Sequence, residues 1–346
     1  MASSIPLHRL PLNAIKVVFG QLFKCDVESI ICLSTCSTKT KCLVKSMKLK
    51  KHSINVHVKN TLSISFSILN QPKYSVWNPT GITDLKTLTP CRLFIPGIST
   101  LLSKPSVRDW VDHFLYIFNQ ESIDLQFTDF LMWTDRLESI YESLKGLSID
   151  TLNISEVDEE ELNFEILRLF RLMTNLYMGE FDGREEPDVS EASFNQLRGI
   201  ITGNMERISL RQRIPLDLDT LLIMNGIEIH LSSPRLSDQD FNMFLKLWVQ
   251  GSNPRLEMLE CFYPEDGNKQ FSKSVILRGI QYKKHSRNLK REFKSDRWKN
   301  STFLLSGGYD IWRKDGTIAT FWFKRNSFDM FVWSSTDAAN NFLSEF

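Results

Sequence analysis

The sequence lacks the motifs that mark the familiar enzyme classes. None of its six histidines lies in H-E-x-x-H, and no H-x-E is paired with C-x-x-C. Gly307-Gly308 stands alone, without a P-loop or dinucleotide fingerprint, and no G-x-S-x-G elbow occurs. Asp112 and His113 have no nucleophile motif beside them, so we interpret them as polar residues on a helix surface. We therefore expect no catalytic residue and no cofactor.

Cysteine is scarce, and long hydrophobic runs are missing. The six cysteines form no C-x-x-C pair, which argues against a structural zinc site, and we expect no metal. The simplest interpretation is that the cysteines are small buried thiols of a protein in a reducing compartment. No run approaches the ~18 apolar residues of a membrane helix, and no apolar signal core follows Met1. The pattern predicts an intracellular protein, in the cytoplasm or nucleus, without membrane attachment.

Net charge is nearly absent, at +1, but its distribution is uneven. Lysines and arginines concentrate in two runs, 39–51 and 283–299, which lie on either side of an acidic middle. Phe293 and Trp298 interleave the second run, and basic residues with aromatics can bind nucleic acid. A solvated surface is the commoner meaning of such runs. Nucleic-acid binding therefore stays an alternative rather than the favoured function.

With 346 residues, 42% of them hydrophobic, the chain can form about two domains with a sizeable core. Residues 5–46 predict three short helices. Leu10-Pro11 precedes apolar residues at helical spacing, Asp26 can cap a second helix, and Ser37 can cap a third. Some 40 residues cannot enclose much core, so apolar surface should remain for a partner.

This first segment resembles an F-box of the variety common in nematodes. The resemblance is carried by Leu10-Pro11, Cys25-Asp26-Val27, Leu33-Ser34 and Cys36-Ser37 with the lysines that follow. The tryptophan that many F-boxes carry near their end is missing. The resemblance implies docking onto the Skp-type adaptor of a cullin–RING ubiquitin ligase. The adaptor-binding residues that we predict are Leu7, Leu10, Pro11, Ile15, Val18, Leu22, Val27 and Ile30.

Behind this segment the periodicity changes. Alternation over 54–68 predicts a β-hairpin, the composition of 70–90 predicts a loop, and 107–120 has helical spacing. From about residue 122 an apolar-x-x-apolar-x-apolar pattern recurs after helical stretches, every 26 residues or so, within the leucine-rich-repeat range. Six copies end at Ile154, Met178, Leu210, Ile229, Cys261 and Tyr282. Stacked units of this kind make a solenoid with a parallel sheet on one side and helices on the other.

The best-marked helix of this repeat region lies between Ser237 and Gly251. Ser237 and Asp240 have near capping-box spacing, and Gly251 can end the helix. The predicted buried stripe is Phe241, Phe244, Leu245 and Trp248. Residues 236–257 also resemble the type 2 F-box-associated domain found behind nematode F-boxes, through the motifs Asn242 to Trp248 and Gly251 to Glu257. Asp315-Gly316 then predicts a hairpin that caps the last repeat.

The predicted fold class is α/β: a small helical F-box, then a leucine-rich-repeat-like β/α solenoid flanked by β-hairpins. We assign 1–50 to the F-box and 51–130 to a hairpin, a loop and the start of the repeat domain. Residues 131–335 form the F-box-associated repeat domain with its C-terminal hairpin cap. In its strands, the residues beside the inward positions should form one surface. This surface would bind substrate, or it would be merely solvated or covered by the 70–105 loop.

The substrate-binding residues that we predict on this surface are Asn153, Tyr177, Arg207, Ser209, Glu228, His230, Met258 and Glu260. The predicted function is a non-catalytic substrate receptor of a ubiquitin ligase. Its partners would be the Skp-type adaptor, through it a cullin, and an unidentified protein substrate. The alternatives are a nucleic-acid-binding protein and an interaction scaffold that assembles no ligase.

Overall fold

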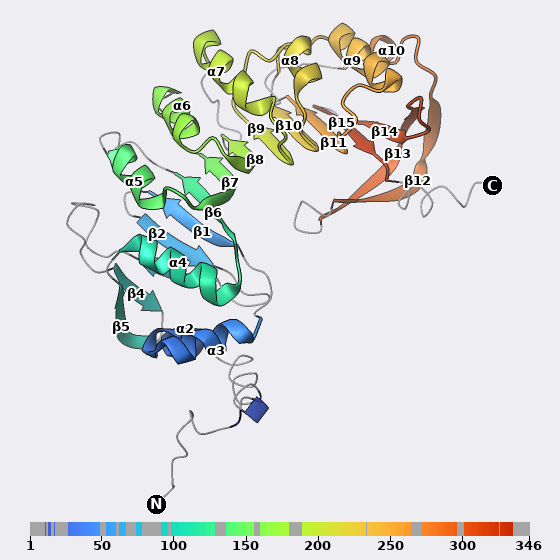
Figure 1. Ribbon diagram of the computed structural model, residues 1–346. Coiled ribbons are helices and arrows are strands. Elements are labelled where there is room, and N and C mark those ends of the chain that lie inside the picture. Colours follow the sequence, from blue (N-terminus) through green and yellow to red (C-terminus); the bar gives the residue numbers. More distant parts are fainter. Residues whose placement is uncertain are drawn as a thin grey trace, which may run out of the picture. The chain divides into compact units, whose positions relative to one another are not determined.

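The structure, a computed structural model, is a mixed α/β fold with a large sheet. Two compact units, Met1–Asp150 and Thr151–Phe346, divide the chain and are described in turn (Figure 1). The structure describes residues 11, 13, 14, 17, 27–48, 53–59, 62–66, 74–77, 91–95, 98–104, 106–128, 136–155, 160–179, 189–232, 234–263, 271–295, 301–324 and 326–334.

The first unit begins with two of the three predicted short helices, α2 (Val27–Cys36) and α3 (Thr38–Ser46). Ser37 caps α3 as predicted, since its side chain accepts a hydrogen bond from the backbone N–H of Thr40. The Thr40 hydroxyl accepts the Ser37 N–H in return, which completes a capping box. Most of the first predicted helix lies outside the described residues.

The sheet of this unit contains the predicted hairpin, β1 (Ile54–Val58) and β2 (Leu62–Phe66), which pair antiparallel. It continues through β3 (Tyr74–Trp77), β4 (Cys91–Ile95) and β5 (Ile98–Lys104). On the other side of β1, β6 (Ser122–Phe127) pairs with it in parallel. The prediction of loop throughout 70–90 is wrong at β3, because pairing with β2 overrides the local composition.

Two helices complete the first unit, α4 (Val107–Phe118) and α5 (Leu137–Leu144). The predicted helix over 107–120 is confirmed: Ser106 caps α4, and Asn119 ends it in the left-handed region at φ 52°. His113 was expected on the helix surface and is instead 1% exposed, with its Nε2 2.8 Å from Ser34 Oγ on α2. Asp112 is exposed as expected and pairs with Arg108.

The second unit is built on parallel strands in sequence order, and β7 (Ser148–Ile154) spans its boundary. β8 (Met173–Met178), β9 (Arg207–Leu210), β10 (Glu228–Ser232) and β11 (Met258–Phe262) pair in parallel. The helices α6 (Glu160–Leu169), α7 (Glu191–Ile201), α8 (Leu218–Ile223) and α9 (Asp238–Gln250) precede them in turn. Register aligns Leu176, Ile208, Ile229 and Leu259 in one buried row.

The helix α9 follows its sequence signals closely. Ser237 and Asp240 form a capping box, and Gly251 ends the helix at φ +114°. The buried residues of α9 are the predicted stripe, Phe241, Phe244, Leu245 and Trp248. A short helix, α10 (Lys273–Ile276), follows β11 and packs against α9.

The C-terminal part extends the sheet beyond β11. β12 (Lys283–Ser295), β13 (Ser301–Trp312), β14 (Ile318–Phe323) and β15 (Ser327–Val332) pair antiparallel in order, and β15 pairs antiparallel with β11. The predicted hairpin turns at Gly316, with φ +88°. The sixth repeat copy, ending at Tyr282, is wrong, because that segment is a turn and β15 occupies the place of a further parallel strand.

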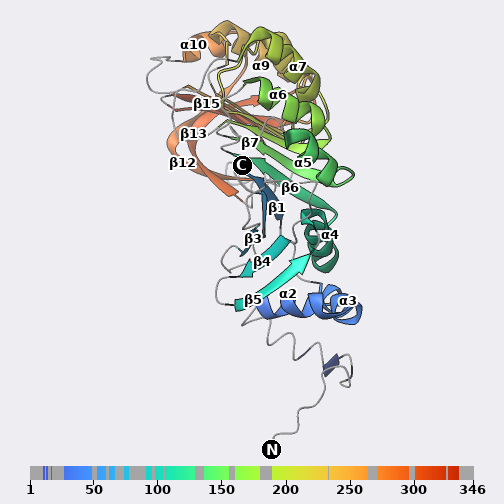
Figure 2. The same ribbon diagram turned by 90° about the vertical axis from the view of Figure 1, so that its left-hand side faces the viewer.

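The strands β12 and β13 also pack on one face of the second unit. Phe293 of β12 and Leu305 of β13 form a buried cluster with Met258, Phe331 and Trp333. Figures 1 and 2 show the curved β12 on the opposite side of the parallel strands from α7, α9 and α10. Part of the face that the repeat pattern left open is therefore covered by the C-terminal strands.

Candidate functional site: the polar face of the second unit

The residues predicted to bind substrate lie next to one another in the register of β8–β11. Tyr177 is opposite Ser209, Ser209 is opposite His230, and His230 is opposite Glu260. Arg207 is opposite Glu228, which is opposite Met258. Asn153 lies on β7, half-buried. All eight residues thus lie on adjoining strands, from β7 to β11.

The prediction that this face is open to solvent is wrong over β9–β11. Arg207 is 7% exposed and Met258 2%, while Ser209, Glu228 and His230 are each 1% exposed. Tyr177 and Glu260 are partly exposed. These side chains are buried because β12 and β13 pack on this face, as described above. From the sequence, the 70–105 loop was the expected cover.

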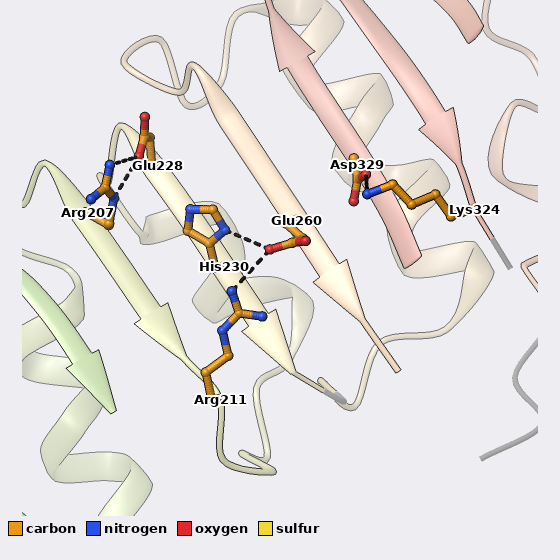
Figure 3. A network of polar contacts seen from close by, with 7 residues as sticks. All are labelled: Arg207, Arg211, Glu228, His230, Glu260, Lys324 and Asp329. Atoms are coloured by element: carbon orange, nitrogen blue, oxygen red, sulfur yellow. Dashed lines mark hydrogen bonds and ion pairs between the residues drawn. The ribbon is translucent and has the colours of Figure 1, made fainter. Parts of the chain in front are cut away.

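An ion pair between β9 and β10 forms the first half of the network in this face (Figure 3). Arg207 Nε donates to Glu228 Oε2 at 2.7 Å, and Nη2 donates to the same oxygen. Arg207 Nη1 donates to the hydroxyl of Tyr177, and Ser295 Oγ of β12 donates to Glu228 Oε1. Each carboxylate oxygen of Glu228 thus has a donor, as a buried charge requires.

The second half of the network centres on Glu260 of β11 (Figure 3). His230 Nδ1 lies 2.9 Å from Glu260 Oε2, and Arg211 Nη2 donates to that oxygen at 3.2 Å. Burial raises the pKa of Glu260, but the hydrogen bond with His230 and the nearby charges of His230, Arg211 and Lys324 outweigh it. They hold the pKa at about 2. Glu260 is therefore ionised at neutral pH.

Asp329 of β15 adds a second carboxylate beside this cluster (Figure 3). Its side chain is 1% exposed and pairs with Lys324 Nζ at 2.7 Å. Burial raises the pKa of Asp329; the charge of Lys324 opposes this shift, and Glu260 adds to it. Asp329 is therefore more readily protonated than an ordinary aspartate as pH falls.

A separate buried network fastens β12 to β13 and β14, and sequence reasoning missed it. Arg291 makes two bonds to Asp310, at 2.9 and 3.1 Å, and His285 Nε2 lies 2.7 Å from Asp310. Thr320 Oγ1 donates to Asp310 at 2.6 Å and accepts from Trp333 Nε1 at 2.7 Å. The missed signal was the alternation of Arg291 with Phe293 and Ser295, which marks an inward face.

The register of Ser209, His230 and Glu260 brings together the residue types of a hydrolytic triad. Ser209 and His230 are each 1% exposed, so a substrate cannot reach the hydroxyl or the imidazole. The arrangement is suited to holding strands together rather than to nucleophilic attack. Within the described ranges, no three His, Cys, Asp or Glu side chains gather closely enough to hold a metal ion.

The structure describes only some of the predicted adaptor-binding residues. Leu7, Leu10, Ile15, Val18 and Leu22 lie outside the described residues. Pro11 is exposed, and Val27 and Ile30 are in α2. In the part of the chain that the structure describes, no helix has the length and apolar character to cross a membrane.

The short helices of the first unit are fastened to α4. Besides the bond between Ser34 and His113, the Tyr116 hydroxyl lies 3.3 Å from Cys42 Sγ of α3. The Lys45 ammonium lies 4.1 Å from the centroid of the Tyr116 ring, and Asn119 Nδ2 donates to the Lys45 carbonyl at 3.1 Å. These contacts join α2 and α3 to the sheet domain of the first unit.

The loop after α9 explains part of the Gly251–Glu257 motif. Asn253 is 8% exposed, with φ 47°, and its Nδ2 donates to the carbonyls of Leu222 and Met224 at the end of α8. Arg255 Nη1 donates to the carbonyl of Asn225 at 3.1 Å. The motif therefore supplies hydrogen bonds to the carbonyls at the end of the preceding helix, α8. It fastens the α9–β11 segment to the α8–β10 segment.

Comparison with known proteins agrees with these motifs. Residues 196–261, from α7 to β11, match the family model described as F-box associated. A relative from Caenorhabditis elegans, "F-box associated domain-containing protein sdz-33", is 24% identical over 191 residues, which span 55% of this chain and 54% of that protein. No solved structure matches. Residues 196–261 are thus similar to the F-box-associated family, as the motifs over 236–257 predicted, and the chain spans about half the length of the curated relative that it matches.

Proposed function

We propose that this chain is a substrate receptor of a cullin–RING ubiquitin ligase. The observation that carries the proposal is the order of two segments in one chain. An F-box-like segment with the Leu10-Pro11 opening comes first, and the F-box associated region 196–261 follows. The domain division proposed from sequence, 1–50, 51–130 and 131–335, fits this role, with the last part a leucine-rich-repeat-like solenoid.

The role of such a receptor is positioning. The F-box would bind the Skp-type adaptor and through it a cullin, while the repeat domain binds a protein substrate. Holding substrate lysines near the activated ubiquitin raises their effective concentration, and catalysis belongs to other subunits. The attachment of α2 and α3 to α4 supports this role in one respect, because it fixes the end of the F-box-like segment on the first unit.

The polar face keeps only part of its proposed substrate-binding role. Asn153, Tyr177 and Glu260 remain partly accessible and are retained as candidates. Arg207, Ser209, Glu228, His230 and Met258 are buried, so we assign them to supporting the sheet. The nucleic-acid alternative loses support because Arg291 and Phe293 of its second basic run are buried as well.

The test is co-purification with the adaptor. A Leu10→Ala, Pro11→Ala variant should bind the Skp-type adaptor roughly tenfold more weakly, because burying a leucine contributes about 1.5–3 kcal/mol. The matched control is Leu172→Ala, a leucine that is 84% exposed in the second unit. Circular dichroism should show that both variants are folded. Unchanged adaptor binding by the Leu10→Ala, Pro11→Ala variant would remove the main support for the proposal.

A further inference from the structure

The strand β12 stands at the end of the strand order, and its 13 residues make it a long edge strand. Among the described strands it pairs with β13 alone. Between His285 and Lys290 the register shifts, and from Lys290 to Ser295 the pairing is regular. An edge strand of this length is a template onto which another extended chain can pair.

The exposed charged side chains of this edge strand are mostly basic. Its exposed basic residues are Lys283, Lys284, Arg287, Lys290 and Lys294. Glu292 is the one exposed carboxylate in β12, and the acid of β13, Asp310, is buried against Arg291. The outer face of the edge is therefore strongly positive.

An apolar residue lies within this basic surface. Leu304 of β13, 53% exposed, is opposite Glu292 in the register. Lys290 and Lys294 lie two residues to either side of Glu292 on the same face, about 7 Å away along the strand. An extended segment paired with β12 would meet Lys290 and Lys294 with Glu292 between them, and Leu304 would lie one strand further in.

We propose that β12 binds an extended acidic segment of a partner protein by strand addition. Backbone hydrogen bonds would supply affinity, and acidic side chains facing Lys290 and Lys294 would select the segment. The inference rests on the proposed function in one respect: the segment would belong to the substrate. A nucleic acid fits less well, because Phe293 is buried and cannot stack on bases, and Arg291 is 2% exposed.

The probe is a fluorescent eight-residue peptide that alternates glutamate with valine or threonine. A Lys284→Glu, Lys290→Glu, Lys294→Glu variant of the full chain should bind it at least ~10-fold more weakly than wild type, since these charges face the ligand. Binding by wild type should weaken as salt is raised. A peptide N-methylated at every residue should not bind, because no backbone N–H is left to pair with β12.

The matched control reverses three exposed charges elsewhere in the second unit: Arg171→Glu, Arg278→Glu and Lys314→Glu. It carries the same net charge as the β12 variant and should bind the peptide like wild type. Equal weakening in the control would attribute binding to net charge and overturn the proposal. Equal binding of the N-methylated peptide would overturn strand addition.

Two further outcomes would also overturn the proposal. Tighter binding of oligothymidine than of the peptide, lost in the β12 variant, would make the strand a nucleic-acid surface. No binding of the peptide by wild type would leave the lysines as protection against edge-to-edge pairing. Adaptor co-purification of the same preparations tests the proposed function separately, because the β12 variant should retain it.

Discussion

Replacing Arg207 with alanine should destabilise the second unit strongly. Glu228 is 1% exposed, and Arg207 supplies two of its hydrogen bonds, at Nε and Nη2. Without the guanidinium, the carboxylate keeps only the bond from Ser295 and stays buried beside β12. Removing one partner of a buried ion pair costs about 3–5 kcal/mol, against ~5–15 kcal/mol for the whole stability of a domain.

Urea unfolding at neutral pH, followed by circular dichroism, measures this loss. Arg171→Ala is the control, because Arg171 is exposed in the same unit. An Arg207→Met, Glu228→Leu double variant should recover most of the stability, since apolar residues can replace a buried pair. A change below about 0.5 kcal/mol for Arg207→Ala, the range of surface substitutions, would refute the burial argument and restore the open face inferred from sequence.

Two other substitutions test the electrostatics and the attachment of α3. The pKa of Glu260 is lowered from 4.5 to about 2, so its ionised form stabilises the fold above pH 4.5, and this contribution is lost as pH falls toward 2. Glu260→Gln should cost about 3 kcal/mol of unfolding free energy at pH 7 and about 1 kcal/mol at pH 3 in urea titrations, and a pH-independent cost would contradict the pairing. Tyr116→Ala should raise hydrogen exchange in Thr38–Ser46 roughly tenfold because it removes the Lys45 contact, whereas Tyr141→Ala on α5 should not; equal exchange would show that α3 is held elsewhere.

The sequence predicted elements well where local chemistry decides them. The capping box of Ser237, the left-handed Gly251 and the buried stripe of α9 each follow from side-chain chemistry within one or two turns. The apolar pattern that ends at Met178, Leu210, Ile229 and Cys261 marked the parallel strands for the same reason, because period two fixes which residues face the helices.

Features that depend on long-range pairing were not predicted. In the sequence, β12 is only a basic run. Its contacts with distant strands show that Arg291 and Phe293 point inward. The segment that ends at Tyr282 has the spacing of a sixth repeat, yet it forms no strand. Instead β15, which comes much later in the chain, pairs with β11. Burial of Arg207 and Glu228 follows from the packing of β12 on this face.

The central claim is that this chain joins a Skp-type adaptor to a protein substrate. Affinity purification of the full chain, with mass spectrometry of what it retains, tests this claim most directly. The account predicts that the adaptor and a cullin are recovered with wild type and lost with the Leu10→Ala, Pro11→Ala variant. Recovery of other proteins without adaptor or cullin would contradict the account, and the chain would then be an interaction scaffold outside any ubiquitin ligase.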